Sequence, residues 1–397
     1  MIRSTVAHVD LAALQANFKA IQNFLAAGTA DPSHLRRSAA SVGQGAPRHP
    51  VPQVIAVVKA NAYGHGAERV ALALEAAGAG LLACADIEEG IVLRRAGVRA
   101  PILVFGALSV SDLDGVFEFS LTPTISSPAA ARAVQAAAAK HSATLGYHLK
   151  IDTGMNRLGF RHDNLRRTLP ELLGSPNLRL EAVFTHFATA DDPERTFFNE
   201  QREHFEMALK TIEELGGGES RPLIHAANSA ATLRDSRVWY DMVRPGLLLY
   251  GIVPPPMATT IPLTPVMSLT SRVVAVKGLR PSEGVGYGLR FHADTPVTTA
   301  VIPAGYADGI DLRVSGRCHV LIRGRRVPIV GAVSMDMMTV DVTGLDDVSP
   351  GDEVVIIGRQ GNESWQQIDA REMAATIGTI PYEIVCRIGA RIERQYD

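Results

Sequence analysis

Cysteine is scarce in this chain, and the few cysteines that occur lie far apart. Cys84, Cys318 and Cys386 stand among 397 residues and form no CxxC pair and no cluster with histidine. This spacing argues against a disulfide framework and predicts no metal site. Cys84 falls in the apolar run LLACA and is expected in the core.

Long apolar runs and an excess of one charge are also missing. No stretch reaches about 18 uninterrupted apolar residues, so no transmembrane helix is expected. The formal net charge of −2 offers no basic surface for nucleic acid or an anionic membrane. Asp10 and Lys19 interrupt any signal-peptide pattern at the N-terminus. We therefore expect a cytoplasmic protein that binds neither nucleic acid nor membrane.

The first part of the chain contains short apolar runs that alternate regularly with amphipathic, Ala-rich stretches. It opens with STVAHV as a strand and Asp10 as a helix N-cap, and residues 28–50 read as a loop. Strands that alternate with helices predict an N-terminal (β/α)8 TIM-like barrel. The eight expected strands are VIAVV (54–58), LLACA (81–85), PILVFG (101–106), LTPTI (121–125), LGYHLKI (145–151), LEAVFTHF (180–187), PLIHAAN (222–228) and WYDMV (239–243).

This alternation ends near Pro262. The stretches SRVVAVKGL, TPVTTAVIP, CHVLIRGRRVPIVGAVSMDMMTVDV and DEVVIIG are β-rich and punctuated by glycine and proline. They predict a C-terminal, mostly antiparallel β domain over residues 263–397, interrupted by a helix over residues 369–379. Residues 1–262 would form the barrel, and the first strand could pack with the C-terminal domain.

Polar residues follow the expected barrel strands, where such barrels collect their active sites. Lys59 comes directly after VIAVV. Burial there would lower the pKa of the ammonium and favour a Schiff-base nucleophile or a base. The alternative is a surface lysine at a strand end. The other strand ends carry Lys150 with Arg157, His186, Asn228 with Ser229, and Arg244.

Each of these residues has a plainer interpretation beside the functional one. Arg157 could hold a carboxylate or phenolate, or pair with an acid of the protein. An inward Lys150 needs a counter-charge or a chemical modification, and a buried ion pair is the alternative. His186 could stack on a cofactor ring or simply be a packed histidine. Tyr287 and Tyr306 lie in Gly-flanked turns, where a phenol could act as a base or merely pack.

The loops after the last two strands commonly bind phosphate in such barrels. Asn228, Ser229 and the N–H groups at Gly246 and Leu247 would suit a phosphate. The segment NSAA could equally be only a helix N-cap. Arg244 immediately precedes this point and could reach a ring nitrogen.

Taken together, these motifs resemble the alanine racemase family, whose members are fold-type III pyridoxal 5′-phosphate (PLP) enzymes. The resemblance runs from about Val6 to Tyr382. The motifs occur in the family's order: AVVKANAYGHG with the cofactor lysine, HLKIDTGMNRLGF, THFATAD, HAANSAA, MVRPG, GVGYG, PAGYADG and VSMDMM. It implies that the β domain completes the active site of a partner subunit in a head-to-tail homodimer.

The resemblance also implies roles for single residues. Lys59 would carry PLP and act as one base, and Tyr287 would be the second base, donated by the neighbouring subunit. Lys150 matches a position that is often carbamylated in the family. The other implied cofactor-binding residues are Tyr63, His186, Asn228, Ser229, Arg244, Gly246, Leu247 and Tyr382. The implied substrate-side residues are Arg157, Tyr306, Met335 and Asp336.

The implied reaction interconverts L-alanine and D-alanine, with Lys59 on the D face of Cα and Tyr287 on the L face. The product would supply peptidoglycan, although a catabolic role is equally compatible with the sequence. Arg244 facing the pyridine nitrogen argues against a decarboxylase. Two alternatives stay open: a broader amino-acid racemase that accepts serine, and a non-enzymatic PLP-binding barrel, which would match the first domain alone.

Two positions depart from the family's pattern. Ser334 stands where many members have cysteine, which removes a thiol from the substrate mouth. Arg313 lies one position later than the corresponding arginine of many relatives, so no role is transferred to it. The loop 28–50 is longer than usual and is given no function.

Overall fold

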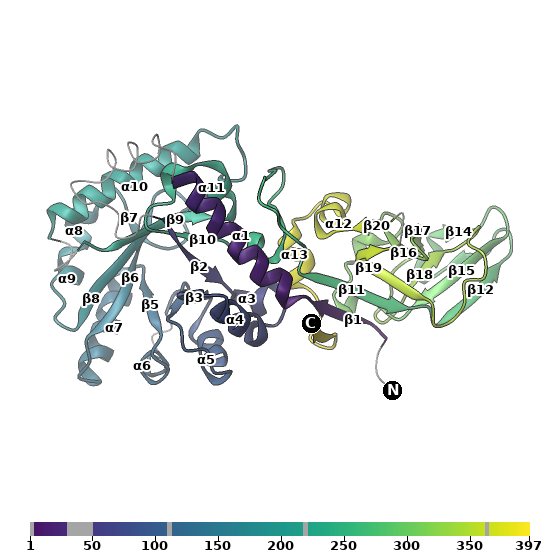
Figure 1. Ribbon diagram of the computed structural model, residues 1–397, viewed down its shortest axis with the longest axis horizontal. Coiled ribbons are helices and arrows are strands. Elements are labelled where there is room, and N and C mark those ends of the chain that lie inside the picture. The colour runs from purple at the N-terminus through teal and green to yellow at the C-terminus, as the bar shows by residue number, and fades with distance from the viewer. Residues whose placement is uncertain (1–3, 30–50, 109–112, 217–220, 362–364) are drawn as a thin grey trace.

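The structure, a computed structural model, describes residues 4–29, 51–108, 113–216, 221–361 and 365–397. It is elongated, with a barrel at one end and a β domain at the other (Figure 1). The segment that the sequence marks as a loop, 28–50, lies outside the described residues from residue 30 onward. Its first two residues, Gly28 and Thr29, instead end helix α1 (Leu11–Thr29).

The first domain is a closed parallel barrel. Within the described residues, eight strands form the ring β2-β3-β4-β5-β6-β8-β9-β10, every neighbouring pair is parallel, and the β5–β6 pairing closes it. The short strand β7 (Phe160–Arg161) pairs in parallel with the end of β6. The ring strands are β2 (Gln53–Val57), β3 (Leu81–Cys84), β4 (Ile102–Val104), β5 (Thr122–Ile125), β6 (Leu145–Asp152), β8 (Leu178–Phe184), β9 (Leu223–Asn228) and β10 (Met242–Arg244).

Helices surround this ring, as the alternation in the sequence predicts (Figure 1). Strand residues such as those of β4 are buried on both faces, which explains why they read as continuous apolar runs. The expected N-cap is confirmed, because Ala13 N donates to Asp10 Oδ1 at 2.7 Å. The helices are α3 (Lys59–Tyr63), α4 (Ala67–Ala76), α5 (Ile87–Arg95), α6 (Asp114–Glu118), α7 (Pro128–Lys140), α8 (Leu165–Thr168), α9 (Pro170–Leu173), α10 (Phe197–Glu214), α11 (Ser229–Arg234), η1 (Ser236–Val238) and η2 (Leu247–Tyr250).

The second domain is a mostly antiparallel sheet with the order β12-β15-β18-β17-β16-β19-β11-β1-β21, and β20 pairs with β19. Its strands are β1 (Val6–Val9), β11 (Met267–Arg272), β12 (Ala275–Leu279), β15 (Val297–Ile302), β16 (His319–Ile322), β17 (Arg325–Val330), β18 (Met338–Asp341), β19 (Glu353–Gln360), β20 (Gln366–Ile368) and β21 (Glu393–Tyr396). A separate hairpin pairs β13 (Gly284–Val285) with β14 (Phe291–His292). The helices are α12 (Ala370–Ile377), α13 (Pro381–Cys386), η3 (Tyr287–Leu289), η4 (Tyr306–Asp308) and η5 (Leu312–Val314).

The two ends of the chain meet in this second sheet. Strand β1 pairs antiparallel with β11 and parallel with β21, so the N-terminal strand packs with the C-terminal domain. Residues 251–266, between η2 and β11, contain no helix or strand. We propose the domain boundary near residue 262, inside that connection.

Candidate active site

The polar residues expected at the strand ends gather at one mouth of the barrel. Lys59 begins α3 directly beyond β2, and Lys150 lies near the end of β6. His186 follows β8, while Arg244 ends β10. Since all barrel strands are parallel, these carboxyl ends face the same side. Strand β8 ends two residues before His186, so this side chain belongs to the loop and not to the strand.

The turn that carries Lys59 has an unusual backbone. Ala60, Asn61 and Ala62 have φ values of 53°, 52° and 53°, and Tyr63 has 53°. A left-handed conformation costs roughly 1–2 kcal/mol for each residue that has a Cβ. Such strain persists only where the surroundings enforce it, and it is concentrated at functional sites.

Three side chains hold this turn in place. Glu89 accepts from Ala60 N at 2.6 Å and from Ala85 N at 2.7 Å, so one carboxylate joins the ends of β2 and β3. His65 Nδ1 donates to the carbonyl oxygens of Ala62 and Tyr63, at 3.0 and 2.9 Å. Asn61 Oδ1 accepts from Ala67 N at 2.8 Å. The sequence analysis missed Glu89 and His65; the strand-end rule could have found Glu89, because it lies in the first turn after β3.

The surroundings of Lys59 lower the pKa of its ammonium group. Burial is the largest cause, and the positive charges of Arg157 and Arg244 act in the same direction. The carboxylate of Glu89 opposes them. A lysine with a lowered pKa is more often neutral near pH 7, and only the neutral amine is a nucleophile or a base.

Arg244 lies at the centre of a buried hydrogen-bond network. Its Nη2 donates to the carbonyl oxygens of Thr185 and Ala226, each at 2.8 Å, and contacts His186 Nδ1 at 3.3 Å. Its Nη1 donates to His225 Nδ1 at 2.8 Å. Burial lowers the pKa of Arg244 to about 9, which still leaves the guanidinium charged at pH 7. Among the described residues, these contacts engage Nη1 and Nη2 only.

The network continues into the barrel through two histidines that the sequence analysis did not select. His225 Nε2 lies 3.0 Å from His148 Nδ1. Burial and the charge of Arg244 hold the pKa of both imidazoles below the usual value, to about 3 for His148. Both rings are therefore neutral, and since Arg244 donates to His225 Nδ1, the proton of His225 is on Nε2 and points to His148.

Lys150 is buried, and no ion pair of the described residues involves it. Its Nζ lies 4.7 Å from the centre of the Phe184 ring. Burial, Arg244 and Arg157 lower its pKa to about 7, and Asp152 only partly opposes them. The plain interpretation of a buried ion pair is therefore not supported.

At the expected phosphate site, backbone N–H groups already donate to side chains of the protein. Ser229 Oγ accepts from Gly246 N at 2.9 Å, and Asn228 Oδ1 accepts from Ala231 N at 2.9 Å as the N-cap of α11. A Cβ on Gly246 would overlap the hydroxyl of Tyr63, so only glycine fits this close approach. The ring of Tyr63 lies 5.9 Å from that of Tyr382, which α13 brings from the second domain.

Four expected residues lie in the β domain, away from this mouth. Tyr287 belongs to η3 beside β14, and Figure 1 shows β14 in the β domain at a distance from α3. Tyr287, Tyr306 and Met335 expose 78%, 44% and 53% of their surface. Asp336 contacts Arg391 of the C-terminal segment. One subunit alone therefore does not bring them to Lys59. Arg157 also is exposed, in the loop between β6 and β7.

The two departures from the family's pattern have local explanations. Ser334 Oγ donates to Met337 O at 2.9 Å and accepts from Met337 N at 3.1 Å, so the hydroxyl closes its own loop. Arg313 pairs with Asp311 and Glu383. Neither contact requires a ligand.

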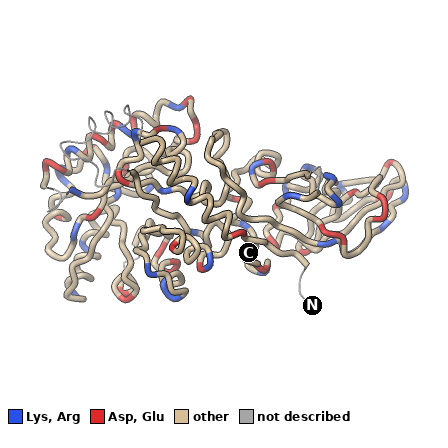
Figure 2. The backbone as a smooth tube through the Cα atoms, in the orientation of Figure 1, with Lys and Arg blue, Asp and Glu red and all other residues tan. Residues whose placement is uncertain are grey.

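Lys and Arg residues and Asp and Glu residues are both distributed along the backbone of both domains (Figure 2). Within the described residues, no three His, Cys, Asp or Glu side chains are grouped as a metal site would require. In the same part of the chain, no helix combines the length and apolar character needed to cross a bilayer.

Comparisons with known proteins agree with this arrangement. The model of the alanine racemase N-terminal domain matches residues 30–254, and that of the C-terminal domain matches residues 266–396. The chain is 40% identical to an alanine racemase of Symbiobacterium thermophilum over 397 residues, covering 100% of this chain and 97% of the relative. It is 42% identical to that of Carboxydothermus hydrogenoformans over 349 residues, covering 87% and 92%.

Solved structures give the same result. Alanine racemase from Bacillus anthracis with bound L-Ala-P has a TM-score of 0.85 and 35% identity, and the match covers 100% of this chain and 96% of that one. The enzyme from Bartonella henselae with covalently bound pyridoxal phosphate has a TM-score of 0.80 and 27% identity, covering 99% of each chain. The parallel barrel followed by a mostly antiparallel β domain is thus the architecture of these relatives. This chain belongs to the alanine racemase family.

Proposed function

We propose that this protein interconverts L-alanine and D-alanine with PLP held by Lys59. The observation that carries the proposal is the position of Lys59, in a strained turn at a strand end, where burial and two arginines lower its pKa. Covalent cofactor attachment requires a neutral lysine amine, which the lowered pKa supplies, and the strained turn around it is of the kind found at functional sites. The relatives named above support alanine as the substrate.

The residues present fit PLP. Lys59 would bind its carbonyl carbon, and the glycine approach at Gly246 with the hydroxyls of Tyr63 and Ser229 would surround its phosphate. Protein groups engage Nη1 and Nη2 of Arg244, and its Nε would be the donor to the pyridine nitrogen. When bound, the cofactor supplies the electron sink that makes the α-proton of the amino acid acidic.

The protein's own task is to move a proton at Cα from one face to the other. Lys59 would serve the D face and Tyr287 the L face, and Arg157 would orient the substrate carboxylate. A charged arginine cannot accept a proton, so a pyridine nitrogen facing Arg244 would stay unprotonated. An unprotonated ring would withdraw electrons less strongly, which favours return of the proton to Cα over side reactions.

A second subunit would supply Tyr287. Several large apolar side chains of the β domain are exposed in the single subunit, and an interface that buried them together would be stabilised by the hydrophobic effect. They include Tyr287, Leu289, Tyr306, Leu312, Met335 and Met337. A head-to-tail homodimer would cover such residues and bring Tyr287, Tyr306, Met335 and Asp336 to the partner's Lys59. We include this shared site in the proposal.

Lys150 is proposed to carry a carbamate. The neutral amine would attack the carbon of CO2, form an N–C bond and release one proton to solvent, which leaves an anionic carbamate near Arg157. With a pKa of about 7, Lys150 is largely neutral at pH 8 and protonated at pH 5. We expect a carbamate signal by carbon-13 NMR with labelled bicarbonate at pH 8, absent at pH 5 and absent in Lys150→Met. No such signal at pH 8 would contradict this assignment.

The substrate test is an assay of D-amino-acid formation from a panel of L-amino acids. We expect alanine to be preferred, because Tyr287, Tyr306 and Met335 would narrow the pocket. One additional group on the substrate side chain changes the difference in transition-state binding between two substrates by only about 1–3 kcal/mol. Slow turnover of serine is therefore compatible with the proposal. Comparable rates on lysine or arginine would instead identify a racemase of broad specificity. No racemisation of any amino acid, with PLP bound, would favour a non-enzymatic barrel.

A further inference from the structure

Two loops of the β domain carry the residues expected on the substrate side. One contains Tyr306, in η4, and the other contains Ser334, Met335 and Asp336. Backbone bonds join them: Tyr306 N donates to Ser334 O, and Ala307 N donates to Met335 O, each at 3.0 Å. These two backbone hydrogen bonds couple the loops to each other.

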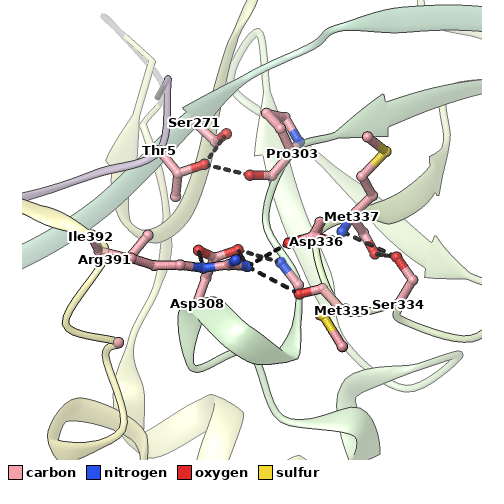
Figure 3. A network of polar contacts seen from close by, with 12 residues as sticks. Thr5, Ser271, Pro303, Asp308, Ser334, Met335, Asp336, Met337, Arg391 and Ile392 are labelled. Atoms are coloured by element: carbon pink, nitrogen blue, oxygen red, sulfur yellow. Dashed lines mark hydrogen bonds and ion pairs between the residues drawn. The ribbon is translucent and has the colours of Figure 1, made fainter. Parts of the chain in front are cut away.

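A single arginine from the C-terminal segment connects both loops (Figure 3). Arg391 Nε donates to Asp308 Oδ1 at 2.7 Å, and Nη2 donates to Asp308 Oδ2 at 3.1 Å. The same Nη2 donates to Met335 O at 3.2 Å and lies 2.9 Å from Asp336 Oδ1. Arg391 thus contacts the first loop at its base and the second loop at its tip.

The two ends of this network differ in burial. The side chain of Asp308 is completely buried, and its Oδ2 also accepts from Gly305 N at 2.9 Å. Asp336 is half exposed, with 51% of its side-chain surface accessible. Arg391 thus links a completely buried carboxylate to a half-exposed one in the second loop.

We propose that Arg391 is a positioning residue for the active site of the partner subunit. It holds the Tyr306 and Met335 loops in the one arrangement that they present across the dimer. This inference rests on the shared site proposed above. Only a planar guanidinium can serve a bidentate carboxylate, a carbonyl and a second carboxylate together; a lysine retains the charge without this geometry.

The first test compares Arg391→Lys with a matched control. Arg323 also joins a carboxylate to two loop carbonyls in the β domain, those of Asp346 and Asp347, which belong to the loop between β18 and β19. We expect Arg391→Lys to lower kcat/KM for alanine by roughly tenfold to a hundredfold through misplacement of the substrate-side loops, mainly in KM. Arg323→Lys should leave kcat/KM unchanged. Its effect on the Tm should be similar to that of Arg391→Lys. Equal kinetic effects of both variants would contradict the proposal.

The second test asks in which subunit Arg391 acts. Subunits carrying Lys59→Ala and Tyr287→Phe are refolded together, so that the mixed dimer has one competent site, built from Lys59 of one subunit and Tyr287 of the other. Arg391→Lys is then added either to the Lys59→Ala subunit, which supplies Tyr287, Tyr306 and Met335, or to the Tyr287→Phe subunit. We expect the rate to fall only in the first arrangement.

The outcomes are distinguishable. Equal loss in both arrangements would show a general role in folding or dimer formation and overturn the proposal, as would no loss in either. If the parent mixture without Arg391→Lys recovers no activity, the shared site itself is wrong, and the trans role of Arg391 is wrong with it. Size-exclusion chromatography of each mixture controls for dimer formation.

Discussion

Replacement of Lys59 by alanine is expected to abolish both the visible absorbance of the bound cofactor and the racemisation of alanine. Lys59 is the lysine that the barrel places at the mouth with its pKa lowered by burial and by Arg157. Removing its amine removes the covalent attachment and the D-face base in one step. Reconstitution with PLP, followed by an absorbance spectrum and an assay in both directions, measures both losses.

Two further variants separate chemistry from folding in this experiment. Lys59→Arg keeps a positive charge and a long side chain, but a guanidinium stays protonated and cannot form the attachment, so the same loss is expected. Lys210→Ala removes an exposed lysine from α10 and should leave the spectrum intact. A persistent cofactor band in Lys59→Ala would show that another residue holds the cofactor.

The Tyr287→Phe variant is expected to retain the cofactor spectrum and lose racemisation by about 10²–10⁴-fold, the usual contribution of a general acid or base. Only one oxygen is removed, from a side chain that is 78% exposed in the single subunit, so the fold should be unaffected. In D2O, the variant should still exchange the α-proton of D-alanine through Lys59 but not that of L-alanine. Full racemisation in both directions would refute the two-base assignment.

Mixing subunits tests the origin of Tyr287. Neither Lys59→Ala nor Tyr287→Phe dimers should be active alone, whereas random mixing of equal amounts should restore about a quarter of the wild-type rate in a symmetric dimer with shared sites. If each site used only its own chain's Tyr287, mixing would restore nothing. The result therefore separates a shared site from a self-contained one.

The barrel could be predicted from the sequence because its strands are buried on both faces. That burial produces continuous apolar runs, and all eight of the expected strands are present, with ends shifted by a few residues. The strand ends then identified Lys59, Lys150 and Arg244 without any knowledge of distances. Parallel strands bring their carboxyl ends together whatever the loops do.

Other features of the candidate active site depend on backbone conformation and could not be predicted from apolar runs. The left-handed turn at Ala60–Tyr63 occurs in a sequence with ordinary residues, and nothing local requires it. Glu89 and His65 matter because of that turn. In the sequence, His148 and His225 are single histidines within largely apolar strands. Their hydrogen bonds to each other and to Arg244, which only the fold creates, make them part of the Arg244 network.

The eight barrel strands, the residues at their ends and, through the motifs, the family follow from the sequence alone. Those properties are local, because each depends on periodicity or on a short run of residues. Three features instead come from long-range contacts. Glu89 and His65 hold four left-handed residues, burial with two arginines lowers the pKa of Lys150 to about 7, and Arg391 joins two loops that are distant in the sequence. Burial and hydrogen-bond geometry arise from residues far apart in the chain, so no local pattern encodes them.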